Sequence, residues 1–88
     1  QNILDTTDIK TETRIALENI STILNAAGMK TDNVVKATVY MKDLKKFSEM
    51  NEVYAGFFSK DPPARETVEI KNLPKGAHIE ISVVAVAD

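Results

Sequence analysis

The chain has 88 residues, of which 43% are hydrophobic and 27% charged, with three glycines, three prolines and no cysteine. This length fits a single domain over residues 1–88, and the composition excludes wholesale disorder and collagen-like repeats. The longest apolar run is far shorter than the about 20 residues that span a bilayer. Without cysteine there is no disulfide, thiolate nucleophile or cysteine-based metal site, and a single histidine cannot form a histidine-rich centre.

The net charge is −2, from 11 basic and 13 acidic side chains, and no basic patch stands out. Non-specific binding to nucleic acid is therefore a poor default. The first residues show no charged stretch followed by an apolar one, so no export signal is predicted, and we expect a cytoplasmic protein. A domain of this size buries a limited fraction of its surface, which favours a partner subunit as part of the stable fold.

The first predicted element is a helix over residues 8–27. Residues 1–7 show no periodicity and begin without a methionine, so they are interpreted as an incoming connection. Asp8 or Thr7 is the expected N-cap, and Gly28 supplies the left-handed residue that commonly follows a helix. Apolar residues recur at spacings of three and four: Ile9, Ala16, Leu17, Ile20, Ile23, Leu24 and Ala27.

From residue 34 to residue 41 the period changes to two, which predicts a strand. Val35, Ala37, Val39 and Met41 are expected on one face, and Val34, Lys36, Thr38 and Tyr40 on the other. Asp43 is the expected cap of a second helix that runs to about residue 58. Its Met and aromatic stripe is typical of core packing: Phe47, Met50, Val53, Tyr54, Phe57 and Phe58.

Two further strands are predicted at 66–70 and 78–87, after a loop fixed by Pro62 and Pro63. The last strand is apolar on nearly every residue, so both faces of the sheet need a cover. The two helices can cover one face, and an oligomer interface is the economical cover for the other. The element order predicts an α+β domain with a mixed sheet, in which 34–41 and the following strand are parallel and the last two strands form an antiparallel pair.

No phosphate-binding loop, catalytic triad or metal-ligand cluster is present in the sequence. The unusual local arrangement is a proline-stiffened loop that delivers Arg65 at the mouth of a strand. The planar guanidinium suits a carboxylate or a phosphate because it can bind either through two parallel hydrogen bonds. The alternative is a surface arginine in an ion pair.

Glu80 is the second candidate, because it lies in a strand otherwise built of Ile, Val and Ala. It is either held by a partner, with Arg65 across the antiparallel strands as a reasonable choice, or turned to solvent at a strand edge. Asn51 lies on the apolar side of the second helix, as a structural group or a site residue. His78 is expected to be exposed and receives no role, and the two tyrosines are expected to pack with hydrated hydroxyls.

Four stretches together resemble the RidA/YjgF family of reactive-intermediate deaminases: ENISTILNAAG, NVVKATVYMKDLKKFSEMNEVYAGFF, PPARETVEI and LPKGAHIEISVVAVA. They occur in the family's order and spacing over nearly the whole chain. The specific parts are PAR followed by a strand, and LPKGA followed by IEI. The helical stretches alone are weak signals.

The resemblance implies a chorismate-mutase-like α+β fold, with a mixed sheet and two helices packed on one face. It also implies a homotrimer whose sheets pack inward, with active sites in clefts between subunits. Members hydrolyse enamines and imines, such as 2-aminoacrylate, 2-iminopropanoate and 2-iminobutanoate, to 2-keto acids and ammonia. No cofactor and no metal is needed.

Residue by residue, the resemblance assigns Arg65 to the arginine that clamps the substrate carboxylate and Glu80 to the glutamate near the attacking water. Asn51 matches an asparagine that lines the cleft. Thr67 stands where many members carry cysteine, and it is expected to keep the backbone contacts of that position. A threonine hydroxyl without a nearby base is a poor nucleophile.

The resemblance also leaves alternatives open. Family members begin with an additional strand pair that contributes to the site, and these N-terminal strands are expected to be absent from this chain. Either the sequence is an incomplete part of the protein, or it is a truncated form whose activity is in doubt. The alternatives to a deaminase are a non-catalytic ligand-binding or regulatory trimer and an endoribonuclease, and the net negative charge argues against the latter.

Overall fold

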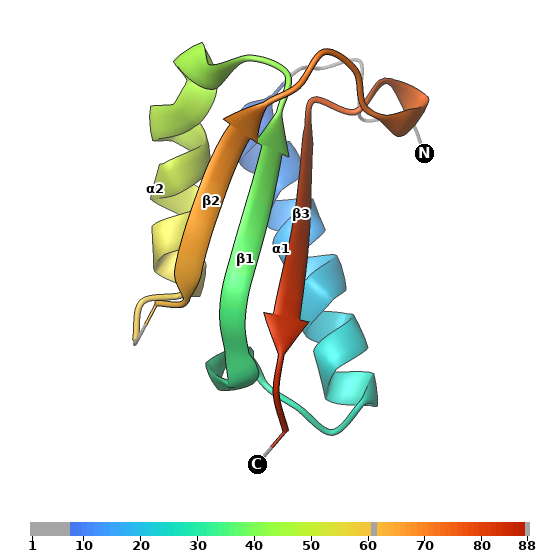
Figure 1. The fold of residues 1–88 in the computed structure, drawn as a ribbon, viewed down its shortest axis with the longest axis vertical. Coiled ribbons are helices and arrows are strands. Elements are labelled where there is room, and N and C mark those ends of the chain that lie inside the picture. Colours follow the sequence, from blue (N-terminus) through green and yellow to red (C-terminus); the bar gives the residue numbers. More distant parts are fainter. Residues whose placement is uncertain (1–7, 61, 88) are drawn as a thin grey trace.

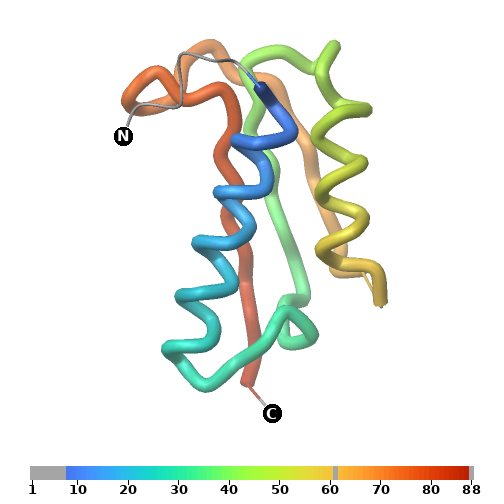
Figure 2. The backbone as a smooth tube through the Cα atoms, turned by 180° about the vertical axis from the view of Figure 1, so that it is seen from behind, coloured from blue at the N-terminus to red at the C-terminus, as the bar shows by residue number. Residues whose placement is uncertain are grey.

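Two helices lie on one face of a three-stranded sheet in the computed structural model, which describes residues 8–60 and 62–87 (Figures 1 and 2). The elements are α1 (Ile9–Ala26), β1 (Val34–Met41), α2 (Phe47–Phe57), β2 (Ala64–Glu69) and β3 (Ile79–Ala85). Short 3₁₀ turns occur at Thr31–Asn33, Leu44–Lys46 and Pro74–Gly76. The α+β class and the two helices on one face are thus confirmed. The expectations for residues 1–7, including Thr7 as a cap, lie outside the described residues.

The strand order is β2-β1-β3, with β1 in the centre. β1 and β2 are parallel, joined through α2 as predicted, whereas β3 runs antiparallel to β1. The predicted antiparallel pairing of the last two strands is therefore wrong. The connection over residues 70–78 passes the end of β1, so β3 takes the opposite edge of the central strand (Figure 1).

The central strand buries its helix-facing side chains as the period of two predicts. Ala37, Val39 and Met41 are all fully buried. At the start of the strand the prediction is reversed, because Val34 is buried and Val35 is 50% exposed. The pairing with β3 shifts register between Val34 and Lys36, and such a bulge changes which face each residue occupies.

α1 packs through a slightly different stripe from the predicted one. Ile9, Leu17 and Leu24 are buried, whereas Ile23 is 68% exposed. Thr13, which was not part of the predicted stripe, is fully buried. Its hydroxyl donates to the Ile9 carbonyl at 2.6 Å. The polar group is therefore satisfied within the helix, which lets a threonine occupy a core position.

α2 begins one turn later than predicted. The Asp43 side chain accepts from the Lys45 N–H and caps the 3₁₀ turn Leu44–Lys46 instead of α2 itself. The predicted Met and aromatic stripe is confirmed as core, with Met50, Tyr54 and Phe58 buried. No helix among residues 8–60 and 62–87 is long and apolar enough to cross a membrane.

No helix or strand among residues 8–60 and 62–87 covers the sheet face opposite the helices (Figure 1). Two valines on it, Val68 and Val84, are 40% and 54% exposed. We refer to this surface as the open face. Exposed apolar surface of this kind favours association, and the oligomer interface expected on this face stays a prediction.

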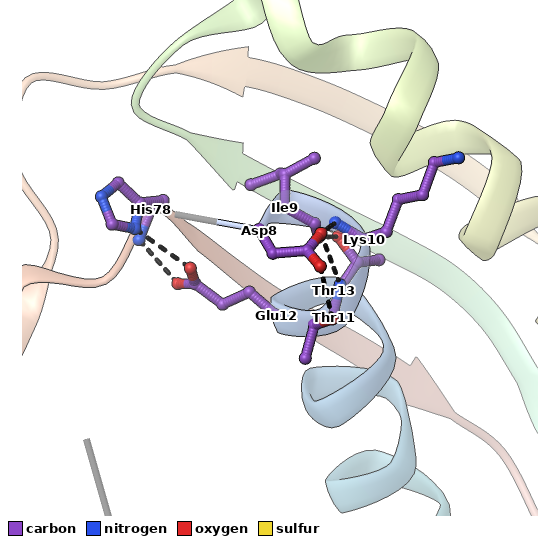
Figure 3. Close-up of polar contacts among 7 residues, drawn as sticks. All are labelled: Asp8, Ile9, Lys10, Thr11, Glu12, Thr13 and His78. Atoms are coloured by element: carbon purple, nitrogen blue, oxygen red, sulfur yellow. Dashed lines mark hydrogen bonds and ion pairs between the residues drawn. The ribbon is translucent and has the colours of Figure 1, made fainter. Parts of the chain in front are cut away.

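Asp8 is the N-cap of α1 (Figure 3). Its carboxylate accepts from the backbone N–H groups of Lys10 and Thr11, at 3.1 and 3.4 Å, and from the Thr11 hydroxyl at 2.8 Å. The hydrogen bond from the Thr11 side chain, followed by that from its backbone, lowers the pKa of Asp8 below its ordinary value. Charged Asp8 therefore stabilises the folded state above its unfolded pKa, and this contribution disappears as the pH falls through the lowered folded pKa.

We expect Asp8→Ala to lower the melting temperature at neutral pH and to lower it less at about pH 2, where more of Asp8 is protonated. Asp8→Asn is the control, since an amide oxygen still caps the helix but does not titrate. Thermal unfolding of the three chains at both pH values measures the difference. A loss of equal size at both pH values would show that the charge of Asp8 is not involved.

Candidate functional site

Arg65 lies at the start of the edge strand β2, and its side chain leaves the sheet on the helix face. Its register partner in β1 is Ala37, which is fully buried beneath the helices. The guanidinium Nη1 donates to Asn51 Oδ1. The guanidinium carbon Cζ lies 4.7 Å from the ring centroid of Tyr54 and 5.2 Å from that of Phe47. Arg65 therefore rests on α2 through one hydrogen bond and two aromatic rings.

The ion pair considered for Arg65 does not occur among residues 8–60 and 62–87. The ion pairs found there involve Lys10, Lys36 and His78. Asn51 is the neutral partner of the guanidinium, and it occupies one of the five N–H donors. Other donors of Arg65 are left for an anion.

Arg65 and the end of α2 line a pocket of about 510 Å³. We call it the arginine pocket. Its polar groups include Arg65 and Asn51, and its apolar walls are formed by Ala55, Phe58, Pro62 and Pro63. Tyr54 and Ser59 complete the lining. Proline has a fixed φ and no N–H, so Pro62 and Pro63 restrict the backbone conformation of the loop that leads into β2. A cation beside an amide, in a cavity of this size with apolar walls, suits a small carboxylic acid.

Thr67 lies two residues beyond Arg65, opposite the buried Val39 of β1. It therefore shares the helix-facing side of β2, but it does not line the arginine pocket. Its hydroxyl is buried and makes no hydrogen bond to a described residue. Its assignment as a substrate-binding residue stays a prediction.

Glu80 lies on the open face, on the other side of the sheet from Arg65. It is exposed on β3 in register with Tyr40, and the two line a shallow pocket of about 310 Å³ with Ser82 and Leu73. Pairing of Glu80 with Arg65 across neighbouring strands is thus wrong within one chain. β1 separates the two strands, and the two side chains leave opposite faces.

A carboxylate–histidine pair that the sequence analysis missed joins α1 to the start of β3 (Figure 3). Glu12 is buried, and its Oε2 accepts the His78 backbone N–H at 2.7 Å while Oε1 lies 3.0 Å from His78 Nδ1. The view of His78 as an exposed residue without a role is therefore wrong. The signal was available, since Glu12 follows Ile9 by three residues and so falls on the apolar stripe of α1.

Tyr54 differs from its predicted state, because its hydroxyl is buried and makes no hydrogen bond to a described residue. Burial raises the pKa of Tyr54 above its ordinary value, and the positive charge of Arg65 opposes part of that rise. The phenol is therefore neutral at physiological pH, and Tyr54 is not a base in this pocket.

Fold and site together define an α+β protein with two helices on one face of a small mixed sheet and a pocket lined by an arginine. Among residues 8–60 and 62–87, no group of three His, Cys, Asp or Glu side chains could hold a metal ion. Residues 1–87 match the family model described as Endoribonuclease L-PSP. The chain belongs to this family, which contains the RidA/YjgF proteins, and the resemblance found in the sequence is confirmed.

Relatives and solved structures agree with this assignment. A RutC family protein of Pyrococcus horikoshii is 53% identical over 78 residues, which are 89% of this chain and 62% of the relative. The 2-iminobutanoate/2-iminopropanoate deaminase of Salmonella typhimurium is 43% identical over 82 residues, 90% of this chain and 64% of the relative. The crystal structure of Escherichia coli TdcF with bound serine has a TM-score of 0.89 at 36% identity, covering 93% of this chain and 67% of that one. The chain thus spans less than two thirds of the length of these two curated relatives.

Proposed function

We propose that the chain is part of a cytoplasmic, homotrimeric hydrolase that converts 2-imino acids and their enamines to 2-keto acids and ammonia. The proposed substrates are 2-iminopropanoate and 2-iminobutanoate. The observation that supports this most directly is Arg65, held by Asn51 in a pocket with apolar walls. The deaminase relative and the serine bound by TdcF support the same class of ligand, a small amino-acid-derived carboxylate.

In the proposed reaction, Arg65 binds the substrate carboxylate through two parallel N–H donors and fixes the C=N carbon in the cleft. A protonated imine is already electrophilic, so a modest catalyst suffices. Glu80 accepts a proton from water as the oxygen adds to that carbon. Glu80 then returns this proton to the amino nitrogen of the tetrahedral intermediate. The C–N bond breaks to release ammonia, and the hydroxyl group loses its proton to solvent to leave the 2-keto acid. Asn51 holds the guanidinium and lines the cleft.

Arg65 and Glu80 lie on opposite faces of one sheet, so the proposal requires more than one chain. We assign the glutamate that serves a given Arg65 to a neighbouring subunit, whose open face packs at the seam. The exposed valines of that face support burial against another copy, because such apolar surface favours association. The shallow pocket around Glu80 is then the second half of a shared cleft.

The test is a coupled assay in which threonine dehydratase generates 2-iminobutanoate and semicarbazide traps what has not been hydrolysed. An active chain lowers the trapped product in proportion to its concentration. Glu80→Gln is expected to lower kcat by about a hundredfold, because the amide cannot accept the proton of water. Glu18→Gln is the control, since Glu18 is exposed on α1, away from the open face. An unchanged kcat in Glu80→Gln would remove the water role of Glu80.

Two alternatives remain as outcomes of the same assay. The arginine pocket also fits a ligand-binding or regulatory trimer, which would bind 2-ketobutyrate but leave the trapping rate unchanged. The description of the family model favours endoribonuclease activity, whereas the net charge of −2 disfavours contact with RNA. RNA cleavage that follows the purified chain and disappears in a pocket variant would favour the nuclease.

A further inference from the structure

We propose that Tyr54 is a positioning residue of the carboxylate clamp, whose ring face holds the Arg65 guanidinium in its binding orientation. The expected effect on substrate binding rests on the proposed function. The orientation of Arg65 by Tyr54 is a property of the chain without ligand. Tyr54 acts through Arg65, and the proposal gives it no contact with the reacting atoms.

The contacts come from one face of α2. Phe47, Asn51 and Tyr54 are separated by four and three residues, so their side chains lie in one row along the helix. The two rings lie 5.2 and 4.7 Å from the guanidinium carbon, inside the about 6 Å range of a cation–π interaction. Tyr54 is the nearer of the two, and it is only 4% exposed. It is therefore a fixed surface beneath a long and otherwise mobile side chain.

The ring, and not the hydroxyl, is the part that positions Arg65. Tyr54 Oη is buried without a hydrogen bond to a described residue, so it orients nothing among them. Asn51 holds one guanidinium nitrogen, and a single hydrogen bond leaves rotation about that contact. The ring face removes this freedom because the guanidinium lies over it. An arginine that is ordered before the anion arrives loses less rotamer entropy on binding.

Variants of Tyr54 and Phe58 separate the effect of the aromatic ring on Arg65 from the effect of packing. Tyr54→Leu removes the ring, and Tyr54→Phe removes only the hydroxyl. Phe58→Leu is the matched control, because Phe58 is an equally buried aromatic residue that lines the same pocket and contacts the Tyr54 ring at 4.9 Å between centroids. No cation–π contact joins Phe58 to Arg65 among the described residues.

We expect Tyr54→Leu to raise the KM for 2-iminobutanoate and the Kd for 2-ketobutyrate by about threefold to thirtyfold, with a smaller change in kcat. Tyr54→Phe is expected to stay within about twofold of the parent chain. Phe58→Leu is expected to lower the melting temperature and, because Phe58 also lines the pocket, to change both constants, but by less than Tyr54→Leu does. Equal effects of Tyr54→Leu and Phe58→Leu on KM would overturn the proposal, since the role of Tyr54 would then be packing alone.

A second measurement needs no ligand. Protons above an aromatic ring are shifted upfield in NMR spectra, so the side-chain protons of Arg65 are expected upfield of ordinary arginine values in the parent chain. The shift is expected to remain in Tyr54→Phe and Phe58→Leu and to shrink in Tyr54→Leu. Ordinary Arg65 shifts in the parent chain would overturn the proposal even if Tyr54→Leu does not fold. If the shifts behave as expected but 2-ketobutyrate does not bind, positioning is supported and the proposed function fails.

Discussion

Replacement of Arg65 by alanine is expected to abolish hydrolysis of 2-iminobutanoate while the chain still folds. The guanidinium supplies the cation of the arginine pocket, and its loss removes the charge that binds the substrate carboxylate. Loss of one partner of a buried, hydrogen-bonded charge pair costs several kcal/mol in binding, so kcat/KM should fall by about a thousandfold. The coupled assay with threonine dehydratase measures this loss.

The structural cost of the same change is expected to be small. Arg65→Ala removes contacts with two rings and leaves Asn51 Oδ1 without its donor, but Arg65 is only half-buried at the edge of the sheet. We expect a loss of about 1 kcal/mol in the free energy of unfolding, read from urea denaturation. A chain that unfolds instead would show that the main role of Arg65 is structural.

Two further variants determine which property of Arg65 matters. Arg65→Lys keeps the charge but loses the planar fork, so an intermediate loss with a raised KM is expected. Arg14→Ala removes an exposed arginine of α1 and is expected to leave turnover unchanged. Parent-level kcat/KM in Arg65→Ala would exclude a carboxylate clamp at this position.

The sequence predicts an element of the fold correctly where a local pattern of residues alone determines the structure. The period of two placed Ala37, Val39 and Met41 on the buried face, and it failed at Val34 and Val35. At these two residues the pairing with β3 contains a bulge, and the alternation of residues within β1 carries no information about its partner strand. The strand order could not be derived in the same way, because a turn-rich connection limits the distance between strand ends but does not choose the edge of β1.

In the candidate site, too, local signals identified single residues but not how those residues are arranged. Arg65 and Asn51 were each singled out from local signals, but their hydrogen bond depends on how α2 packs against β2. The position of Glu80 depends on register, because a shift of one residue moves a side chain to the other face. Arg65 thus lies on the helix face of the sheet and Glu80 on the open face. The proposed reaction therefore requires a cleft shared between two chains.

The largest expected loss of stability comes from Glu12→Ala. The Glu12 carboxylate is buried and accepts the His78 backbone N–H, so it joins the first turn of α1 to the start of β3. Alanine leaves that N–H without its acceptor and also leaves the space of the side chain empty. We expect a loss of about 3 kcal/mol in the free energy of unfolding, measured by urea denaturation at neutral pH.

The backbone contact, rather than the imidazole, should account for most of this loss. His78→Ala removes the 3.0 Å contact to Nδ1 but keeps the 2.7 Å hydrogen bond to the backbone, so its effect should be about 1 kcal/mol. Glu12→Gln retains an acceptor for the N–H and should fall between the two. Glu18→Ala is the control, since Glu18 is exposed on the same helix. If Glu12→Ala costs no more than Glu18→Ala, the Glu12–His78 pair does not help to hold α1 against the start of β3.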